Sequence, residues 1–374
     1  MRRKRKKRGI GFISKTALIF NAFFVLLLLL SYLASVINPS VFWPLAFIGL
    51  AYPFLLAINT AFVVFWLIRK PVYALLSVIS ILIGWKFLFS TIGLRESNAI
   101  EVPKSSGDII RIMTWNVHEF RSFNSDNYSG KGVRLQMLDI IRKEQPDILC
   151  LQEYYSKRKG ESNMRKAITE ILQSSHYYLH EDFGNEWESR GMAFFSKLPL
   201  SDTGHISFPN AMGGNEAVYA DFKFKKKKFR VYNIHLQSIS FQPEDYEYIK
   251  NVKEINTDVE SSKRIGGRLK NAFIKRSEQV KLLREHIRNC SNPVIIAGDF
   301  NDTPTSYAVN QLGKEMYNTF REKGSGFGIT YNGDFPNFQI DYILVSKAFK
   351  VKSYLTVPKK LSDHYPVISD LVLP

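Results

Sequence analysis

Acidic residues are almost missing from the first quarter of this chain, and cysteine is rare throughout. Residues 1–99 contain one acidic residue, Glu96, although the whole chain of 374 residues has 34 Asp and Glu. The two cysteines, Cys150 and Cys290, each lie in or beside an apolar segment. Two such residues exclude a disulfide framework as the basis of the fold, and we expect each to be a buried free thiol.

The positive charge of the chain is concentrated where the acidic residues are missing. Of the net +17, residues 1–99 carry +11, and seven consecutive Lys and Arg occupy positions 2–8. Residues 100–374 carry only +6, with 39 Lys and Arg against 33 Asp and Glu. That excess is too modest to argue for nucleic-acid binding by itself. The basic N-terminus is instead typical of a membrane-topology and lipid-surface signal.

Long apolar runs fill the same first quarter. Ala17–Ile37 and Val41–Ile68 contain no charged residue, and Pro71–Leu94 is interrupted only by Lys86. About 20 apolar residues are needed to cross a bilayer core of about 30 Å. We therefore predict a membrane domain over residues 1–95 with three transmembrane helices at about 17–37, 43–68 and 71–94. A cleaved signal peptide is the alternative for the first run, but two further apolar runs follow it.

The flanking charges predict how these helices are oriented. The basic run at positions 2–8 precedes the first helix, and Arg69-Lys70 lies between the second and third. Basic residues stay on the cytoplasmic side, so the N-terminus should be cytoplasmic and everything after about residue 95 extracytoplasmic. We thus expect a multi-pass protein of the cytoplasmic membrane. Lys86 is the weak point, because a charge within a span is costly unless it reaches a helix end.

The remaining sequence predicts a short linker at residues 96–107 and a second domain at residues 108–374. Helical periodicity is found at Arg134–Glu144, Met164–Ser174 and Phe273–Asn289, and eight short apolar runs predict strands. These strands are Ile109–Trp115, Ile148–Gln152, Met192–Ser196, Ala217–Phe224, Phe229–His235, Val294–Gly298, Ile340–Val345 and Val367–Leu373. Such neighbouring strands favour antiparallel pairing and an α+β fold with two packed sheets covered by helices. Residues 238–275 are polar and could form either a lid or a plain insertion.

Six short polar motifs end apolar runs in this second domain. They are Trp115-Asn116-Val117, Leu151-Gln152-Glu153, Asn233-Ile234-His235-Leu236-Gln237, Gly298-Asp299-Phe300-Asn301, Gln339-Ile340-Asp341-Tyr342 and Ser362-Asp363-His364-Tyr365-Pro366. They place carboxylates, amides and imidazoles where strands would meet loops. Such a set can hold a hard divalent cation and move protons around a phosphate ester. Any one carboxylate is more often a surface or capping group, so the ordered set carries the prediction.

Oxygen ligands in this set suit Mg²⁺, which takes one or two carboxylates together with water and substrate phosphate. Glu153 is the first choice of ligand, with Asp363 or Asp299 second. Asp299 and Asn301 alternate around Phe300, so on an extended backbone their side chains face the same way.

Two of the seven histidines belong to these motifs. His235 ends a predicted strand and His364 follows a carboxylate, and imidazole can act as a general acid or base near neutral pH. Asp341 is available to orient one of the two rings. The other histidines are expected to have surface or structural roles; they are His118, His176, His180, His205 and His286.

The six motifs, in this order over about residues 109–373, resemble the endonuclease/exonuclease/phosphatase superfamily. That superfamily includes pancreatic-type deoxyribonucleases, abasic-site endonucleases, neutral sphingomyelinases and inositol-polyphosphate 5-phosphatases. The resemblance implies a four-layer α/β/β/α sandwich, here preceded by three transmembrane helices, with the active site at one rim of the two sheets. It also implies hydrolysis of phosphate esters that depends on Mg²⁺, with Mn²⁺ as the alternative metal.

The resemblance also implies roles for individual residues. Asn116 would help to orient the phosphate, Glu153 would bind the metal, and Asp363 would support the metal or the network around it. His235 would stabilise the pentacoordinate phosphorus or assist the leaving group. Some deoxyribonuclease relatives pair this His with a second Glu, but the corresponding region here reads Ser189-Arg190-Gly191-Met192, which puts that pairing in doubt.

The remaining roles concern the attacking water. The resemblance implies that Asp299 and Asn301 position or activate this water. It also implies that Asp341 orients His364, which would act as a base or as a cation that binds phosphate. Whether the Asp or the His is the general base stays open at this point.

We therefore expect a membrane-anchored, Mg²⁺-dependent phosphoesterase that hydrolyses a phosphodiester or phosphomonoester by in-line attack of water. A lipid head group is one candidate substrate, and the bilayer is a partner through the N-terminal helices. An extracytoplasmic deoxyribonuclease-like nuclease acting on nucleic acid is the alternative. A catalytically inactive, membrane-tethered binding module is a third reading, and no obligate protein partner is inferred.

Overall fold

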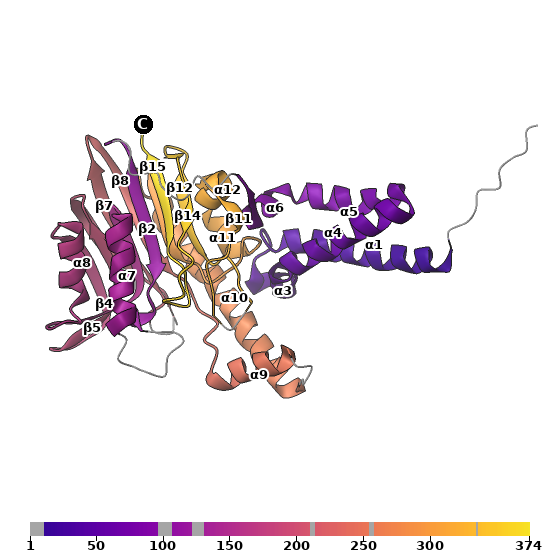
Figure 1. Cartoon of the computed structure of the whole chain (residues 1–374), viewed down its shortest axis with the longest axis horizontal. Helices are drawn as coiled ribbons and strands as arrows, with labels where there is room; N and C mark the ends of the chain where they lie inside the picture. Colours follow the sequence, from indigo (N-terminus) through magenta and orange to yellow (C-terminus); the bar gives the residue numbers. More distant parts are fainter. Residues whose placement is uncertain (1–10, 96–106, 122–130, 210–213, 254–257, 334–335) are drawn as a thin grey trace, which may run out of the picture.

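The computed structural model describes residues 11–95, 107–121, 131–209, 214–253, 258–333 and 336–374. A bundle of N-terminal helices projects from one side of a domain that contains both sheets and helices (Figure 1). The mixed α+β class predicted from the sequence is confirmed. The basic run at positions 2–8 and residues 96–106 of the predicted linker lie outside the described residues.

The bundle contains helices that could cross a membrane, but they break where uninterrupted helices were predicted. By length and composition α1 (Phe12–Leu33) and α4 (Tyr52–Arg69) qualify as spans, and α5 (Pro71–Ile83) qualifies only together with α6 (Trp85–Thr91). The predicted second span is divided between α4 and a separate short helix, α3 (Pro44–Leu50), which α2 (Pro39–Phe42) precedes.

Proline and glycine account for the two breaks. Pro53 lies in the first turn of α4, where its missing N–H costs no helical hydrogen bond, so it favours a helix start there. Gly84 has a non-helical backbone (φ −90°, ψ 22°), and the axes of α5 and α6 differ by 73°. A Cβ at Gly84 would lie 2.1 Å from the ring of Tyr32, so only glycine allows α1 to approach this closely.

A buried polar network connects three helices of the bundle. The Asn21 side-chain amide of α1 donates to Ser77 Oγ of α5 at 2.6 Å, and Ser77 Oγ donates to Asn59 Oδ1 of α4 at 3.1 Å. The Trp66 indole donates to Asn21 Oδ1 at 2.9 Å. Hydrogen bonds of this kind between apolar helices fix which faces meet, so α1, α4 and α5 form one packed unit.

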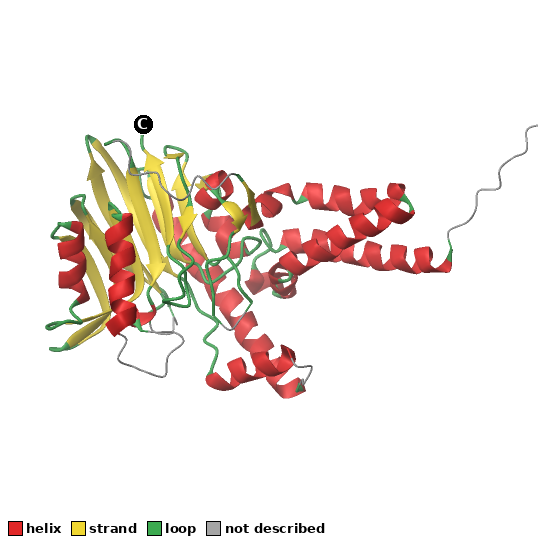
Figure 2. Ribbon diagram, viewed as in Figure 1, coloured by secondary structure: helices red, strands yellow, loops and turns green. Residues whose placement is uncertain are grey.

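The second domain contains two large sheets (Figure 2). All eight predicted strands are present, and the two sheets also contain strands that were not predicted: β4, β6, β10 and β13 at the edges, and β14 beside β15. The first sheet has the order β13-β15-β2-β3-β5-β4, with β14 also on β15; its strands are β2 (Ile110–Asn116), β3 (Ile148–Lys157), β4 (His176–Gly184), β5 (Glu188–Ser196), β13 (Lys350–Val351), β14 (Leu355–Thr356) and β15 (Val367–Val372). The second has the order β10-β12-β9-β8-β7-β6; its strands are β6 (Leu200–Ser207), β7 (Glu216–Phe224), β8 (Lys227–His235), β9 (Val294–Asp299), β10 (Met316–Asn318) and β12 (Asp341–Ser346).

Side-chain alternation along the strands separates three apolar clusters. Ile112 of the first sheet and Val231 of the second belong to the cluster between the two sheets. Met113, on the opposite face of β2, packs in a cluster with α7 (Lys131–Glu144) and α8 (Met164–Leu172). A third cluster packs the other face of the second sheet against α10 (Val259–Arg288) and α11 (Tyr307–Leu312). As predicted, both cysteines are free thiols; Cys150 is fully buried and Cys290 partly.

Most strand pairs are antiparallel, as predicted, but two are parallel. β2 runs parallel to β3, and β8 runs parallel to β9. The prediction is wrong for these pairs because α7 joins the first, and α9 (Pro243–Lys253) and α10 join the second, as helical crossovers. Parallel neighbours end at the same edge of a sheet, so the motifs that follow them come together.

The bundle is attached to the α+β domain by backbone pairing. β1 (Ile92–Leu94), after α6, pairs antiparallel with β11 (Ser325–Phe327), which follows the short helix α12 (Thr319–Lys323). Lys86 Nζ donates to Asn310 Oδ1 of α11 at 3.0 Å. The Lys86 ammonium, the one charge within the third predicted span, is therefore directed toward the α+β domain.

Candidate active site

Three predicted site residues meet at one rim of the second sheet. β8 and β9 pair so that His235 lies opposite Asp299, and β12 pairs with β9 so that Asp341 also lies opposite Asp299. Strand register alone therefore gathers an imidazole and two carboxylates around the end of β9.

The first sheet contributes Asn116 and Glu153 from two neighbouring strand ends. Asn116 ends β2 opposite Gln152 of β3, and the β3–β5 register shifts between Leu151 and Tyr154. Glu153 lies in this irregularity with φ 49°, which is uncommon for a residue with a side chain. Strained backbone of this kind is often found at functional sites, and here it lies where β3 reaches the rim.

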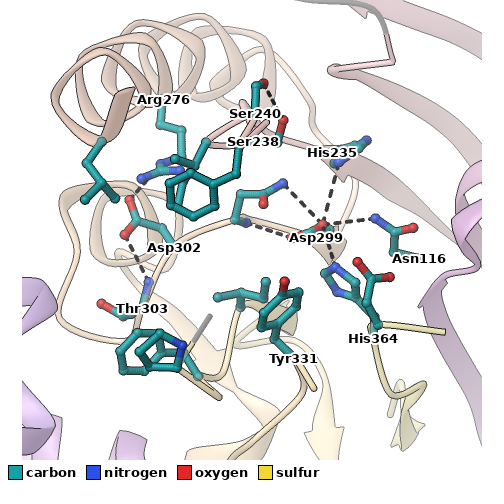
Figure 3. A pocket seen from close by; sticks show the side chains of 18 of the residues that line it. Asn116, His235, Ser238, Ser240, Arg276, Asp299, Asp302, Thr303, Tyr331 and His364 are labelled. Carbon is teal, nitrogen blue, oxygen red and sulfur yellow. Dashed lines mark hydrogen bonds and ion pairs between the residues drawn. The ribbon is translucent and has the colours of Figure 1, made fainter. Parts of the chain in front are cut away.

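Asp299 is the centre of the site (Figure 3). Its side chain is 1% exposed. Asn116 and Asn301 each donate a side-chain N–H to Asp299 Oδ2 at 3.2 Å. The Nε2 atoms of His235 and His364 each lie 3.6 Å from the same oxygen. Residues from four of the six motifs thus surround one carboxylate oxygen.

His364 is held by a carboxylate on the side away from Asp299. Its Nδ1 lies 2.9 Å from Asp341 Oδ2, so the structure brings together the two residues that were predicted to act as a pair. Burial alone would lower the pKa of His364, but the carboxylates of Asp341 and Asp299 hold that pKa well above its usual value. Both carboxylates thus favour the protonated, imidazolium form of this ring. Burial conversely raises the pKa of Asp299, although the imidazoles oppose that rise.

Glu153 and Asp363, the predicted metal ligands, face a residue that sequence reasoning placed elsewhere. His118 Nδ1 lies 3.6 Å from Glu153 Oε2 and 3.8 Å from Asp363 Oδ1. Burial would raise the pKa of Glu153, but the hydrogen bonds from His118 and Asn116 help to lower it to about 2. His118, expected to have a surface or structural role, thus lies partly exposed beside two motif carboxylates. Its signal in the sequence was its place two residues after Asn116.

His235 differs from the deoxyribonuclease pattern in its partner. Its Nδ1 lies 2.9 Å from the backbone oxygen of Gly214. Glu188, from the region where a second Glu was sought, accepts a hydrogen bond from the Tyr155 hydroxyl instead. The partner of His235 Nδ1 is thus a backbone carbonyl, where the deoxyribonuclease pattern would have a Glu carboxylate.

Two motif residues have structural roles. Gln152 Nε2 donates to Asn233 Oδ1 at 2.6 Å, and Asn233 Nδ2 donates to the backbone oxygen of Leu151 at 3.1 Å. Both side chains are buried between the two sheets. Their amides therefore connect the sheets beneath the rim.

The pocket around Asp299 has a volume of about 250 Å³. The predicted lid or insertion at residues 238–275 is largely helical, and its Phe241 and Leu269 form part of one wall. Arg276 lies beyond it on α10, with Nε 2.9 Å from Asp302 Oδ2. Neither member of this buried pair was predicted, because neither belongs to a strand-end motif. Leu50 of α3, in the bundle, also lines the pocket.

Comparison with known proteins agrees with this architecture. The sequence pattern of the Endonuclease/Exonuclease/phosphatase family matches residues 113–364, and residues 14–91 match a domain of unknown function (DUF8431). The structure of an endonuclease/exonuclease/phosphatase from Bacteroides vulgatus is 20% identical with a TM-score of 0.51, covering 71% of this chain and 99% of that one. Another, from Beutenbergia cavernae DSM 12333, is 19% identical with a TM-score of 0.50, covering 71% and 72%. These two structures show the likeness of fold. No curated protein matches the chain.

Proposed function

The chain belongs to the endonuclease/exonuclease/phosphatase family, whose members are typically phosphoesterase hydrolases, and from this premise we propose that it hydrolyses a phosphate ester in the pocket around Asp299. One observation carries the proposal: the buried Asp299 Oδ2 lies 3.6 Å from each of two imidazole nitrogens and 3.2 Å from each of two amide nitrogens. This arrangement suits in-line attack by a water whose proton the carboxylate accepts.

We assign the general base to Asp299 and the cation to His364. The raised pKa of Asp299 makes its carboxylate a stronger base than an exposed one. His364, an imidazolium oriented by Asp341, donates from Nε2 to a phosphate oxygen as negative charge develops there. Asn116 and Asn301 orient the phosphate and the water. His235 assists the leaving oxygen.

We propose Glu153 and Asp363 as the ligands of Mg²⁺, or alternatively Mn²⁺. Both carboxylates lie near the same atom, His118 Nδ1, and both side chains are partly open to solvent. This oxygen-rich, accessible set suits a hard cation that keeps several waters. Among the described residues, the donor atoms of Asp299, Asp341 and His364 also lie within 4.8 Å of one another, but that group is buried and its imidazole is bound to Asp341. When bound, the metal would offset charge on the phosphate.

Metal dependence provides the first test. The purified full chain in detergent should hydrolyse bis(p-nitrophenyl) phosphate with Mg²⁺, lose that activity in EDTA and regain it when Mg²⁺ is restored. Glu153→Gln should raise the Mg²⁺ concentration for half-maximal rate by about 10–100-fold or more, because a ligand charge is lost. The exposed Glu285→Gln on α10 is the matched control and should behave as wild type.

Hydrolysis that survives EDTA, or a Glu153→Gln titration that overlays the wild type, would contradict the metal assignment. No turnover of any ester together with no Mg²⁺ binding by calorimetry would favour the inactive binding module. Sphingomyelin, phosphatidylinositol phosphates and duplex DNA should be assayed side by side. Cleavage of DNA alone, with a steep salt dependence, would favour the nuclease.

We further propose that residues 1–95 form a membrane domain in which α1, α4 and the bent α5–α6 pair cross the bilayer. Residues 108–374 would form the catalytic domain as a four-layer sandwich. The start of α1 and the α4–α5 connection lie at the end of the bundle away from the α+β domain (Figure 1). That end carries Arg69 and Lys70, so it would be cytoplasmic and the catalytic domain extracytoplasmic.

Topology has a direct test. Alkaline phosphatase fused after Pro374 should be active, because it folds only outside the cytoplasm, and green fluorescent protein at the same position should stay dark when exported unfolded. The same two reporters fused after Arg69 should give the reverse result. Fluorescence from the Pro374 fusion would overturn the count of three crossings.

A further inference from the structure

A second, larger cavity adjoins the catalytic pocket on the side of the helical bundle. Its volume is about 760 Å³, within the range of about 300–1,000 Å³ usual for ligand sites. One wall consists of residues from α4, α5, α6 and β1, and the other of Pro304, residues 327–329 and residues 336–339. We call this cavity the bundle groove. Pro336 and Phe338 line both the bundle groove and the catalytic pocket, so the two cavities meet there.

The lining of the bundle groove is mostly apolar. None of the described residues that line it is charged, and Leu56, Ile81, Leu88 and Phe327 are typical of its walls. A soluble phosphate ester gains nothing from such a surface, whereas a hydrocarbon chain is stabilised by leaving water for it. Phe54, also in the lining, is exposed on α4, a helix that is long and apolar enough to cross a membrane. The bundle groove thus borders the region that lipid chains would occupy.

The two walls are held together by specific contacts. Ile92 pairs with Phe327 in the β1–β11 ladder, and both residues line the bundle groove. Thr305 Oγ1 donates to the backbone oxygen of Gly49 at 2.8 Å, which joins α3 to the loop after Asp302. The groove is therefore part of the connection between the bundle and the catalytic domain.

An unsatisfied polar side chain also points to a ligand. Gln339 is 5% exposed and lines the bundle groove, and neither atom of its amide has a hydrogen-bond partner among the described residues. Buried amides are nearly always paired, because leaving one without a partner costs free energy. A ligand that carries an ester or amide group beside an apolar chain would satisfy it. Gln339 also lies two residues before Asp341, close to the catalytic pocket along the chain.

We propose that the bundle groove holds an acyl chain of a membrane phospholipid whose phosphate lies in the catalytic pocket, with Gln339 hydrogen-bonded to the ester or amide that joins the chain to the head-group region. The inference rests on the proposed phosphoesterase function and names its substrate class. The lipid enters sideways from the bilayer between the bundle and the catalytic domain. Pro336 and Phe338, which line both cavities, would lie beside the junction of the lipid's acyl chain and its charged head group.

The reaction on this substrate is a hydrolysis that balances with one water. A bond forms between the water oxygen and phosphorus, and one P–O ester bond of the lipid breaks with its electron pair going to the leaving oxygen. The water proton passes to Asp299, which afterwards releases it to solvent, and the leaving oxygen takes up one proton from solvent to become an alcohol. No oxidant or further reactant is required.

A substitution that fills the bundle groove tests the proposal. Ala57 is exposed on α4 and lines the groove, and Ala61 is exposed one turn further along the helix without lining it. In the full chain reconstituted in phosphatidylcholine vesicles, Ala57→Trp should lower kcat/KM for long-chain phospholipid by about tenfold or more. It should leave the hydrolysis of bis(p-nitrophenyl) phosphate within about twofold of wild type. Ala61→Trp should match wild type on both substrates.

The two substrates separate the failure of this inference from the failure of the proposed function. If the soluble diester is hydrolysed but Ala57→Trp and wild type cleave the lipid equally well, or neither cleaves it, the lipid assignment is wrong and the phosphoesterase remains. If no ester of either kind is hydrolysed, the proposed function itself fails. Preference for duplex DNA over both esters would also overturn the lipid assignment.

Gln339→Leu gives an independent readout. Removing an unpaired buried amide should raise the unfolding temperature of the lipid-free protein, while losing the hydrogen bond to the lipid should raise KM for phospholipid by about threefold to tenfold. An amide that merely supports the fold would lower the unfolding temperature instead. The proposal therefore requires that Gln339→Leu is more stable than wild type but binds phospholipid less well. A lowered unfolding temperature with an unchanged KM would refute the role of Gln339.

Discussion

Asp299→Asn should reduce kcat on any cleaved phosphate ester by about 10²–10⁴-fold, the range typical of losing a general acid or base. The substitution keeps the shape of a side chain that is almost completely buried, but an amide cannot accept the water proton. It also places an N–H₂ group or a single carbonyl oxygen where two asparagine amides now donate to one carboxylate oxygen. The measurement is steady-state hydrolysis under saturating Mg²⁺, with thermal unfolding recorded on the same preparation.

Asp370→Asn is the matched control. Asp370 is also buried, but it lies in β15, where its carboxylate receives hydrogen bonds from the Arg111 guanidinium at 2.7 and 2.8 Å. Breaking that pair should destabilise the protein by about 3 kcal/mol and leave kcat nearly unchanged. Asp299→Asn should show the reverse pattern. Asp299 would be removed from the mechanism if Asp299→Asn had the kcat of wild type. The same conclusion would follow if both variants lost the same amount of stability and the same amount of activity.

His364→Ala should reduce kcat by about 10²–10³-fold, as does the loss of one group that stabilises developing negative charge. Its imidazolium lies between the carboxylates of Asp341 and Asp299, at 2.9 Å and 3.6 Å. Without it two buried carboxylates face each other with no cation between them, so the substitution removes a phosphate-binding cation and disfavours ionised Asp299. Asp341→Asn should have a smaller effect in the same direction, because it only disturbs how His364 is oriented.

The control for this prediction is His286→Ala. His286 lies on α10 with Nδ1 2.9 Å from the Tyr232 hydroxyl, and it does not line the catalytic pocket. It should retain wild-type kcat. The role of His364 would be rejected if His364→Ala and His286→Ala had similar kcat. It would also be rejected if His364→Ala had a higher KM with an unchanged kcat, and added imidazole did not alter either value.

Much of the α+β domain could be predicted from local patterns. The buried strands are apolar runs bounded by polar residues, and all eight were located from that pattern. The two longest of the strands that were missed, β4 and β6, are edge strands with mostly exposed or partly exposed residues, so they carry no apolar run to detect. The others that were missed have only two or three residues each. The helix predicted at Phe273–Asn289 in fact begins at Val259. The prediction missed its first half because that half is polar and lacks a clear apolar stripe.

The helical bundle was harder to predict in detail. Mean apolarity over a long run identifies a membrane segment, but it does not show where the helix breaks. Pro53 and Gly84 are the residues at which the predicted second and third helices are interrupted. A glycine or proline in an apolar run is compatible with either a continuous or a broken helix. At Gly84 the decision depends on Tyr32, which lies on another helix.

Local sequence patterns were enough to predict the family and the polar residues at the strand ends, because apolar run length and the polar residues that follow are properties of neighbouring positions. Which of those residues meet depends on the three-dimensional fold. Register across β8, β9 and β12 places His235 and Asp341 beside Asp299, while Gln152 and Asn233 join the two sheets beneath them. Contacts between residues far apart in the chain also place His118 beside Glu153 and Asp363, and Leu50 of the helical bundle in the lining of the pocket around Asp299. Such contacts depend on packing and strand register over the whole chain, which no local pattern records.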